Sequence, residues 1–139
     1  MSDELELSID HITLSVADFG RAKAFYSALL RPVGLEIVAE VTAEQSGSVP
    51  FAGFGRGRKG NLWIAEDGPQ SPATHICFRA PSRAAVRAFY EAGLANGGTD
   101  NGGPGIREIY HPAYYAAFVL DPEGHNIEAV CFEPEAGDR

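Results

Sequence analysis

The chain has 139 residues, of which 45% are hydrophobic and 22% are charged, and its formal net charge at pH 7 is −8. Such a length and composition are ordinary for a globular protein, so we predict a single domain over residues 1–139. The negative charge argues against a nucleic-acid partner, and no apolar run approaches the roughly 20 residues that a membrane-spanning helix needs.

The first half of the chain, about residues 8–67, has the pattern of one strand, one helix and three further strands. In IDHITLSV (residues 9–16), polar and apolar residues alternate, which predicts a strand with His11 on its polar face. Asp18 can cap a helix that extends to about residue 30 and carries an apolar stripe. The strand candidates that follow are residues 35–41, 49–54 and 61–66.

The second half, about residues 73–133, repeats this order. THICFRA (residues 74–80) alternates in the same way, with His75 on the polar face. A capped helix follows up to about residue 96. The glycine-rich residues 97–105 then predict a flexible rim that could act as a lid. The remaining strand candidates are residues 106–110, 114–120 and 126–132.

The two halves align with one another at a fixed offset of 64 residues. HI at residues 11–12 matches HI at 75–76, and AFY at 24–26 matches AFY at 88–90. The same offset lays IEA near the end of the second half over WIA near the end of the first. A strand–helix–three-strand unit used twice predicts an α+β fold of two βαβββ modules, because each sheet needs a helix to bury its apolar face.

Three titratable side chains occupy notable places in this repeat. His11 and His75 lie on the first strands of their units, and Glu128 lies on the final strand among apolar neighbours. If the first and last strands of a unit are neighbours in a curved sheet, these side chains can converge on one concavity. Two imidazoles and one carboxylate form a site for a divalent cation with open positions for water or substrate. The alternative for each residue is an exposed or hydrogen-bonded side chain.

The segment YHPAYY (residues 110–115) gathers aromatic side chains just before the closing strands. Rings with polar tips suit a pocket wall that orients an oxygenated ligand. His111 is the best candidate for a general acid or base, because the unperturbed pKa of histidine lies near neutrality. Hairpin packing with an exposed histidine is the alternative.

Other polar residues are interpreted as surface groups. Arg79 could hold a carboxylate, although a surface ion pair is the favoured interpretation. Arg56, Arg58 and Lys59 in FGRGRKGN are interpreted as a solvated loop rather than an anion site. His125, in the turn DPEGHN, is expected to be exposed to solvent.

Two features favour a cytoplasmic protein. The N-terminal MSDELELSID is acidic and lacks the basic-then-apolar order of a secretion signal. Cys77 and Cys131 lie in apolar, strand-like runs without a paired CxxC spacing. Both are therefore predicted to be buried free thiols in a reducing compartment.

Three characteristic segments fall in both halves of the chain: DHITLSVADFGRAKAFYSALL, THICFRAPSRAAVRAFY and FVLDPEGHNIEAV. They resemble the vicinal oxygen chelate superfamily, which groups glyoxalase, bleomycin-resistance and ring-cleaving dioxygenase proteins. The resemblance implies two βαβββ modules that form a cupped mixed sheet with helices on the outside, commonly as a homodimer. It also implies that His11, His75 and Glu128 bind one divalent metal ion, which could be Zn, Ni, Mn or Fe.

Some positions depart from individual branches of this superfamily. Glyoxalase I members use a fourth, carboxylate ligand, but the offset from Glu128 leads to Ile64, which cannot ligate a metal. Ring-cleaving dioxygenases use an additional His and Tyr, for which His111 and Phe118 stand here unless a neighbouring tyrosine substitutes. Fosfomycin-modifying members have a Trp near the fourth strand, where Trp63 stands.

The first functional hypothesis is a metal-dependent enzyme whose small oxygenated substrate chelates the cation. Its chemistry would be that of a lyase or isomerase, similar to lactoylglutathione lyase, or dioxygenase-like. The second hypothesis is a protein of the bleomycin-resistance type that sequesters a drug or aromatic molecule, and the third is a structural dimer with a decayed site.

Candidate site residues follow from the same reasoning and resemblance. The candidate catalytic residues are His111, Tyr115 and Tyr110, and the candidate substrate-binding residues are Trp63, Arg79, Tyr114 and Phe118. Several relatives build each site from both chains of a dimer. His11 and His75 therefore need not share a site with Glu128 of the same chain.

Overall fold

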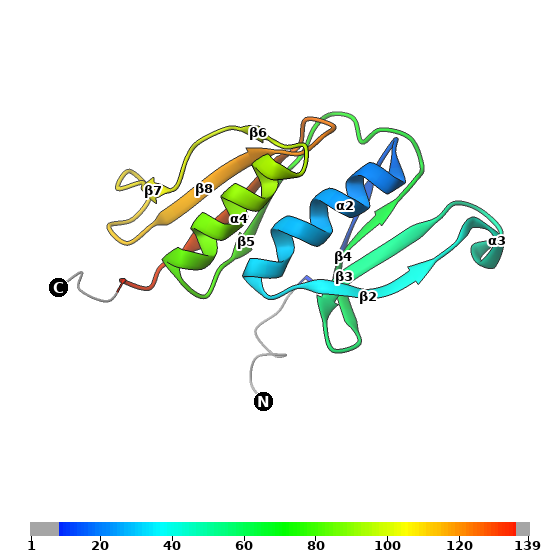
Figure 1. Ribbon diagram of the computed structural model, residues 1–139, viewed down its shortest axis with the longest axis horizontal. Coiled ribbons are helices and arrows are strands. Elements are labelled where there is room, and N and C mark those ends of the chain that lie inside the picture. Colours follow the sequence, from blue (N-terminus) through cyan, green and yellow to red (C-terminus); the bar gives the residue numbers. More distant parts are fainter. Residues whose placement is uncertain (1–8, 136–139) are drawn as a thin grey trace.

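The computed structural model describes residues 9–135, so the predicted start of the first module at residue 8 and both chain ends lie outside it. The first module comprises β1 (Ile12–Ser15), α2 (Phe19–Leu30), η1 (Arg31–Val33), β2 (Glu36–Val41), α3 (Ala43–Ser46), β3 (Phe51–Arg56) and β4 (Lys59–Ala65). The second comprises β5 (His75–Arg79), α4 (Arg83–Ala95), β6 (Thr99–Asp100), β7 (Gly105–Ile106), β8 (Tyr115–Leu120) and β9 (Asn126–Cys131). This order confirms the predicted α+β fold of two βαβββ modules, with β6 and β7 in place of one strand (Figure 1).

Each module has its own mixed sheet. The strand order of the first is β1-β4-β3-β2, in which β1 and β4 are parallel and the other pairs are antiparallel. The strand order of the second is β5-β9-β8-β6, in which β5 and β9 are parallel and β7 also pairs with β8. The first and last strands of each module are therefore neighbours, as convergence of their side chains requires.

Both long helices begin at the predicted capping residues. The side chain of Asp18 accepts a hydrogen bond from the N–H of Arg21 at 3.0 Å, and Ser82 accepts one from Ala85 at 3.0 Å. Gly34 has φ of 90°, and this left-handed conformation ends the turn of η1 that follows α2. None of the helices within residues 9–135 combines the length and apolar character that a bilayer crossing demands.

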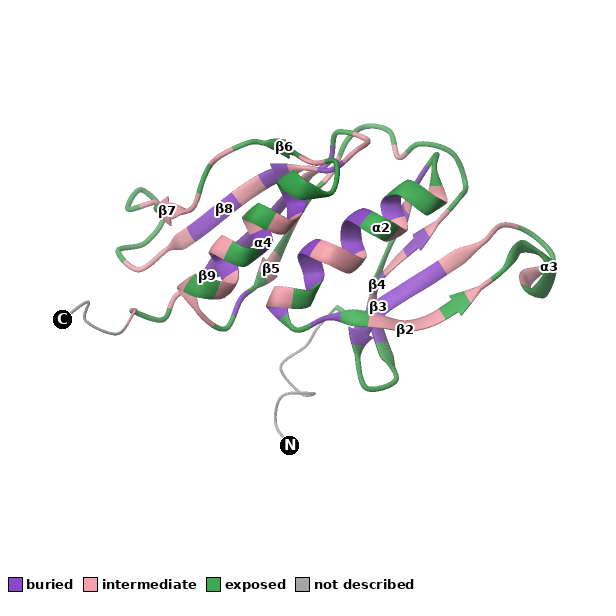
Figure 2. Cartoon of the chain, in the orientation of Figure 1, coloured by how far each residue is buried: buried purple, intermediate pink, exposed green. Residues whose placement is uncertain are grey.

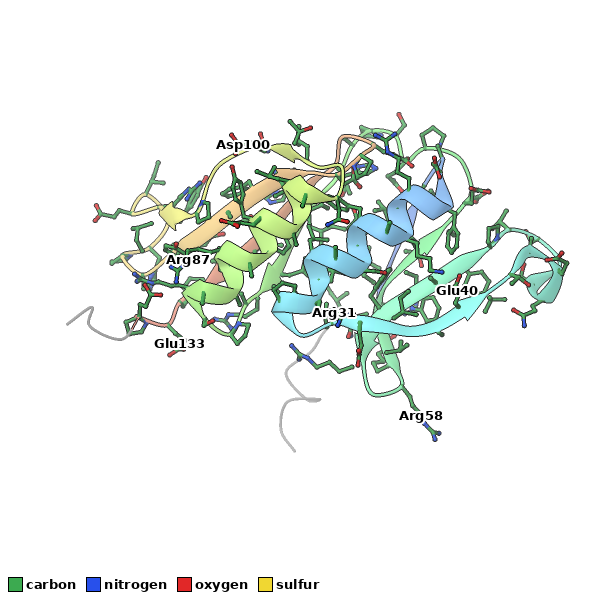
Figure 3. The ribbon with its side chains drawn as sticks, in the orientation of Figure 1. Arg31, Glu40, Arg58, Arg87, Asp100 and Glu133 are labelled. Atoms are coloured by element: carbon green, nitrogen blue, oxygen red, sulfur yellow. The ribbon has the colours of Figure 1, made fainter. Side chains whose placement is uncertain are left out.

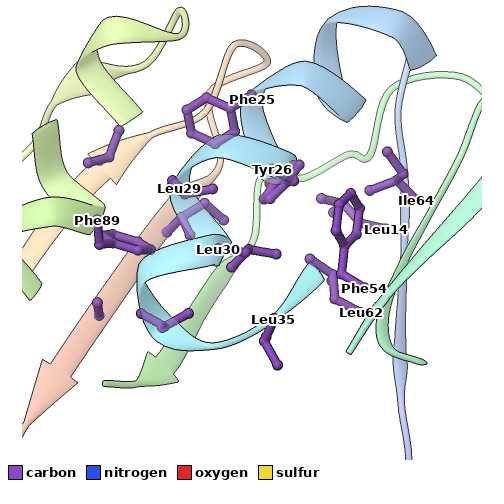
Figure 4. Close-up of a cluster of buried hydrophobic side chains, with 14 of the residues drawn as sticks. Leu14, Phe25, Tyr26, Leu29, Leu30, Leu35, Phe54, Leu62, Ile64 and Phe89 are labelled. Atoms are coloured by element: carbon purple, nitrogen blue, oxygen red, sulfur yellow. The ribbon is translucent and has the colours of Figure 1, made fainter. Parts of the chain in front are cut away.

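One hydrophobic core joins the two modules. In Figure 1 both helices lie in front of the sheets, and Figure 2 shows buried residues along the helices and the strands behind them. Phe25 and Leu29 of α2 and Phe89 of α4 are fully buried and meet in this core (Figure 4). A Cβ at Gly98 would lie 2.6 Å from Val119 and 2.7 Å from Phe25. The contact between modules therefore requires a glycine at this position.

The segment that follows α4 differs from its prediction. The strand expected at residues 106–110 is reduced to β7, and turns occupy the residues between β7 and β8. The glycine-rich rim is held to the sheet, because β6 and β7 both pair with β8. Asp100 strengthens this attachment, since its Oδ1 accepts hydrogen bonds from the hydroxyl of Tyr90 and the N–H of Gly102, each at 2.9 Å.

The strand register corrects the equivalence between the modules. Thr13 of β1 pairs with Trp63 of β4, and Cys77 of β5 pairs with Glu128 of β9. Thr13 and Cys77 are 64 residues apart, whereas Trp63 and Glu128 are 65 apart. The second module thus contains one additional residue between its first and last strands. Glu128 corresponds to Trp63, and the fixed offset that leads to Ile64 is wrong for this strand.

The turn between β8 and β9 fastens the second module to helix α2. Oδ1 of Asp121 accepts hydrogen bonds from the N–H groups of Glu123 and His125 at 2.9 Å, which folds the turn. Oδ2 of Asp121 accepts one from the hydroxyl of Tyr26 at 2.6 Å. The carboxylate of Glu123 accepts one from the N–H of Ala17 at 2.9 Å, just before α2. These contacts fix where β9, and with it Glu128, lies relative to the first module.

Candidate functional site

Glu128 lies near the centre of the open face of the second module, which we define as the sheet face that neither long helix covers. The register places Cys77 of β5 on one side of it and Phe118 of β8 on the other. A cavity of about 310 Å³ is lined by Glu128, His75, Tyr110, Tyr114 and Phe118.

Glu128 is 2% exposed, and each oxygen of its carboxylate has a partner. Nε2 of His75 lies 2.8 Å from Oε1, and the hydroxyl of Tyr114 donates a 2.5 Å hydrogen bond to Oε2. These contacts offset part of the large cost of removing a carboxylate from water. A glutamate is tolerated between Ile127 and Ala129 because two polar side chains of the open face, His75 and Tyr114, contact its carboxylate.

Burial and the nearby carboxylate of Glu128 raise the pKa of two side chains, Tyr114 and Cys77. Loss of hydration, and then the hydrogen bond to Glu128, raise the pKa of Tyr114 above its ordinary value. Desolvation, followed by the charge of Glu128, raises the pKa of the Cys77 thiol to about 12. Cys77 is exposed, which corrects the prediction that it is buried. Cys131 is buried, as predicted. At neutral pH Tyr114 remains a donor and Cys77 remains a thiol.

His75 and Glu128 have the chemistry and spacing of two metal ligands. Imidazole nitrogen and carboxylate oxygen both bind divalent transition metals. Two adjacent ligands at about 2.1 Å from a cation lie about 3 Å apart, close to the 2.8 Å between Nε2 and Oε1. These two residues therefore fit the metal that the sequence predicts.

The third predicted ligand, His11, lies elsewhere. It precedes β1, where its Nδ1 is 2.7 Å from Oδ1 of Asp10. Within residues 9–135, no group of three or more His, Cys, Asp or Glu side chains could hold a metal ion. One chain thus brings together two of the three predicted ligands, and the participation of His11 stays a prediction.

His11 lines a different cavity, of about 570 Å³, which lies over β1, β3 and β4 of the first module. Trp63, predicted to contact substrate, lies against the strand backbone, since a Cβ at Gly53 or Gly60 would come within 2.8 Å of its indole. The ring centroid of Phe51 is 5.9 Å from that of Trp63. The charged residues that line this cavity, together with His11, are Asp10, Arg58 and Lys59.

An aromatic array flanks Glu128 on the side of the turns after β7. The ring centroids of Tyr110 and Tyr114 are 5.1 Å apart, and Tyr114 packs against Phe132 at 5.4 Å. His111 packs edge-on against Phe132 at 5.5 Å, and its Nδ1 accepts a hydrogen bond from the N–H of Ala113 at 2.9 Å. Tyr110 and Tyr114 therefore form a pocket wall, whereas His111 is exposed at its edge.

Two predicted site residues have other surroundings. Tyr115 lies on the helix-covered face of β8, where its hydroxyl accepts a hydrogen bond from Arg87 at 3.2 Å. It therefore stands outside the cavity that Tyr114 lines. Arg79 places its guanidinium 4.8 Å from the centre of the Phe132 ring, a stacking contact in place of the expected surface ion pair.

His125 is 1% exposed, which corrects the prediction that it is solvent-exposed. Its Nδ1 accepts a hydrogen bond from the N–H of Thr74 at 3.1 Å, directly before β5. The signal for this burial was the aspartate that begins DPEGHN, because an aspartate can accept N–H groups two and four residues later and fold the turn inward. The structural roles of Asp121 and Glu123 in this turn were also missed from the sequence, and the same pattern of an aspartate followed by N–H donors could have indicated the role of Asp121.

The chain is similar to known proteins over most of its length. Residues 8–129 match the family model of the Glyoxalase/Bleomycin resistance protein/Dioxygenase superfamily. A comparison with curated proteins gives no match. A glyoxalase/bleomycin resistance protein from Albidiferax ferrireducens T118 is 30% identical and superposes with a TM-score of 0.69, covering 90% of this chain and 98% of that chain.

More distant structures share the fold. A glyoxalase/bleomycin resistance protein/dioxygenase family enzyme from Burkholderia phytofirmans PsJN has 16% identity and a TM-score of 0.66, over 91% of this chain and 100% of that chain. Glyoxalase I from Zea mays has 16% identity and a TM-score of 0.67, over 88% of this chain and 45% of that chain. The family match extends over both modules and includes His75 and Glu128. The chain therefore belongs to the glyoxalase/bleomycin resistance protein/dioxygenase superfamily.

Proposed function

We propose that this protein is a metal-dependent enzyme that acts on a small oxygenated substrate, with lyase, isomerase or dioxygenase-like chemistry. The observation that carries the proposal is the buried carboxylate of Glu128, which is 2.8 Å from Nε2 of His75. Converging titratable groups in a cavity are typical of functional sites. When bound, a divalent cation would act as a Lewis acid on a substrate oxygen.

The residues around this pair would perform distinct tasks. Tyr114 donates to Oε2 of Glu128 and so orients the carboxylate. Tyr110 and Phe118 line the cavity and would limit the access of water to it. His111, exposed beside the aromatic array, would give or take a proton at the edge of the pocket.

We further propose a homodimer in which His11 of a second copy completes each metal site. His11 and the His75–Glu128 pair line different cavities in one chain, which supports a second copy as the source of the third ligand. Both cysteines are free, which supports action in a reducing compartment such as the cytoplasm.

Metal analysis of purified protein tests the ligand assignment. Wild-type protein should retain about one Zn, Ni, Mn or Fe ion per chain after dialysis, because a two-histidine, one-carboxylate set binds such ions. His11→Ala, His75→Ala and Glu128→Gln should each lose it, whereas the exposed Glu91→Gln should not. A wild-type chain that takes up none of the four metals would refute the proposal.

Mixed dimers test whether the site is shared. His11→Ala and Glu128→Gln subunits should each lack metal alone. Refolded together, they should regain about one ion per mixed dimer, because one of its two sites then has all three ligands. If mixing restores no metal while both variants stay folded and dimeric, the site does not draw on two chains.

A second candidate function is sequestration of an aromatic molecule. It is favoured by the larger cavity, which holds Trp63 and Phe51 but lies apart from the His75–Glu128 pair. Ligand stabilisation measured by thermal unfolding separates the two functions. Stabilisation that EDTA leaves unchanged, together with no metal uptake, would favour sequestration over catalysis.

A further inference from the structure

The cavity of the first module has an aromatic floor where the second module has its carboxylate. Trp63 pairs with Thr13 in the strand register, as Glu128 pairs with Cys77. The two modules thus present different chemistry at the same place on equivalent sheets. This position carries the carboxylate of Glu128 in the second module and the flat indole of Trp63 in the first.

The strands beneath Trp63 are shaped to hold the indole flat. A Cβ at Gly53 of β3 would lie 2.8 Å from three atoms of the ring, and a Cβ at Gly60 would also lie 2.8 Å from it. Neither glycine has a positive φ, so the backbone conformation does not require glycine at these positions. The space that the indole occupies does require it. One face of the ring lies against the backbone, and the ring lines a cavity of about 570 Å³.

Among the described residues that line this cavity, one cation has no counterion. Asp10 contacts both Lys59 and Nδ1 of His11, so its negative charge is matched. Arg58 lines the cavity from the turn between β3 and β4, and Figure 3 shows it extending from this hairpin. In the part of the chain that the structure describes, Arg58 has no hydrogen-bond or ion-pair partner. The surrounding protein has a net charge of −8, so this local positive charge is unusual.

A flat ring and one unpaired guanidinium select a particular ligand chemistry. An aromatic ring stacks on an exposed indole face, and a guanidinium binds a carboxylate through two parallel hydrogen bonds. A single unpaired cation matches a single negative charge better than the two charges of a phosphate monoester.

We propose that this cavity binds a flat aromatic monocarboxylate, with its ring on Trp63 and its carboxylate at Arg58. That this ligand is the substrate rests on the proposed function, because His11 of the same cavity is the ligand assigned to the metal site of a second copy. Binding itself needs no metal.

The single tryptophan of the chain makes the test direct. Its indole N–H gives one resonance in a nitrogen-15 correlation spectrum, which reports on Trp63 without further assignment. The 139-residue chain is titrated in EDTA with 2-naphthoate, with neutral 2-naphthamide and with non-aromatic cyclohexanecarboxylate. Calorimetry gives the dissociation constants. We expect 2-naphthoate to shift the resonance and to bind at least about tenfold more tightly than either other compound.

Two pairs of variants assign the contacts. Arg58→Ala should weaken the binding of 2-naphthoate at least about tenfold and leave the binding of 2-naphthamide unchanged. Arg31 is an exposed cation outside the cavity, so Arg31→Ala should change the affinity for neither compound. Gly53→Ala should displace the indole and weaken both naphthalene compounds. Gly20→Ala adds a Cβ that meets only Asp18 at 3.9 Å, so it should have no effect.

Several outcomes would overturn the inference. They are absence of 2-naphthoate binding, equal binding of 2-naphthamide, or an Arg58→Ala variant that binds 2-naphthoate normally. Metal content is measured on the same preparations before EDTA is added. Loss of naphthoate binding with metal retained refutes this inference alone, and naphthoate binding without metal uptake refutes the proposed catalytic function alone.

Discussion

The hydroxyl of Tyr26 donates a 2.6 Å hydrogen bond to Oδ2 of Asp121, and this buried contact joins helix α2 to the turn before β9. The two residues belong to different modules and are 95 positions apart in the chain. Because β9 carries Glu128, the contact couples the packing of the modules to the position of the candidate metal ligand.

Tyr26→Phe should destabilise the protein although it removes a single hydroxyl. The change leaves Oδ2 of the buried Asp121 without its donor, which costs about 1–3 kcal/mol in the free energy of unfolding. Urea denaturation measures this loss. Tyr110→Phe serves as the control, since Tyr110 is 65% exposed and should change stability by less than about 0.5 kcal/mol. Equal stability of Tyr26→Phe and wild type would contradict a stabilising role for the contact.

The same contact predicts how stability depends on alkaline pH. Burial, followed by the charge of Asp121, raises the pKa of Tyr26 well above its ordinary value. The folded state therefore favours the protonated phenol, whereas the unfolded chain releases its proton near pH 10. The contribution of Tyr26 is fully present below about pH 10 and is lost as the pH rises above that value.

The free energy of unfolding of the wild type should accordingly fall more steeply above pH 10 than that of Tyr26→Phe. Urea denaturation at several pH values between about 8.5 and 11 measures the two slopes. Parallel pH profiles for wild type and variant would show that Tyr26 titrates alike in the folded and unfolded states.

Cys77 should react slowly with alkylating reagents despite its exposure. Its pKa of about 12 leaves on the order of 0.01% thiolate at pH 8. The rate of iodoacetamide modification, followed by mass spectrometry in EDTA, should keep rising with pH beyond 9.5, where an ordinary thiol has levelled off. Cys77→Ser identifies the modified residue. Glu128→Gln should accelerate the reaction at pH 8, since the charge of Glu128 helps to raise this pKa.

Truncation of His125 should cost more stability than truncation of His111. His125→Ala leaves a cavity in the core and removes the acceptor of the Thr74 N–H, so it should cost about 2–4 kcal/mol in the free energy of unfolding. His111→Ala affects an exposed side chain and should cost less than about 1 kcal/mol. Chemical denaturation compares both with the wild type, and similar values for the two variants would contradict the structural role of His125.

Much of the architecture follows from local patterns in the sequence. The repeated HI and AFY segments, the caps Asp18 and Ser82, and alternation along the first strands predict two modules of the same build. These signals are local, because capping and strand alternation depend on residues within a few positions of one another. The contact between His75 and Glu128 can also be predicted from the sequence, provided that the first and last strands of the module, β5 and β9, are assumed to be neighbours.

Features that depend on contacts between residues far apart in the sequence were decided by the tertiary structure. A one-residue shift in strand register moves every side chain to the opposite face, so an offset of 64 led from Glu128 to Ile64 when the register leads to Trp63. The same sensitivity placed Tyr115 on the helix-covered face and Tyr114 beside Glu128.

The sequence by itself therefore determined which side chains could form a site, because residue type and the alternation of polar and apolar residues are local properties of the chain. Only the tertiary structure decided which of them meet. It buried His125 against Thr74 and set His11 in a cavity apart from the His75–Glu128 pair. The physical reason is that packing between α2 and α4 and the turn at Asp121 set how the modules lie against each other, and these contacts join residues far apart in sequence.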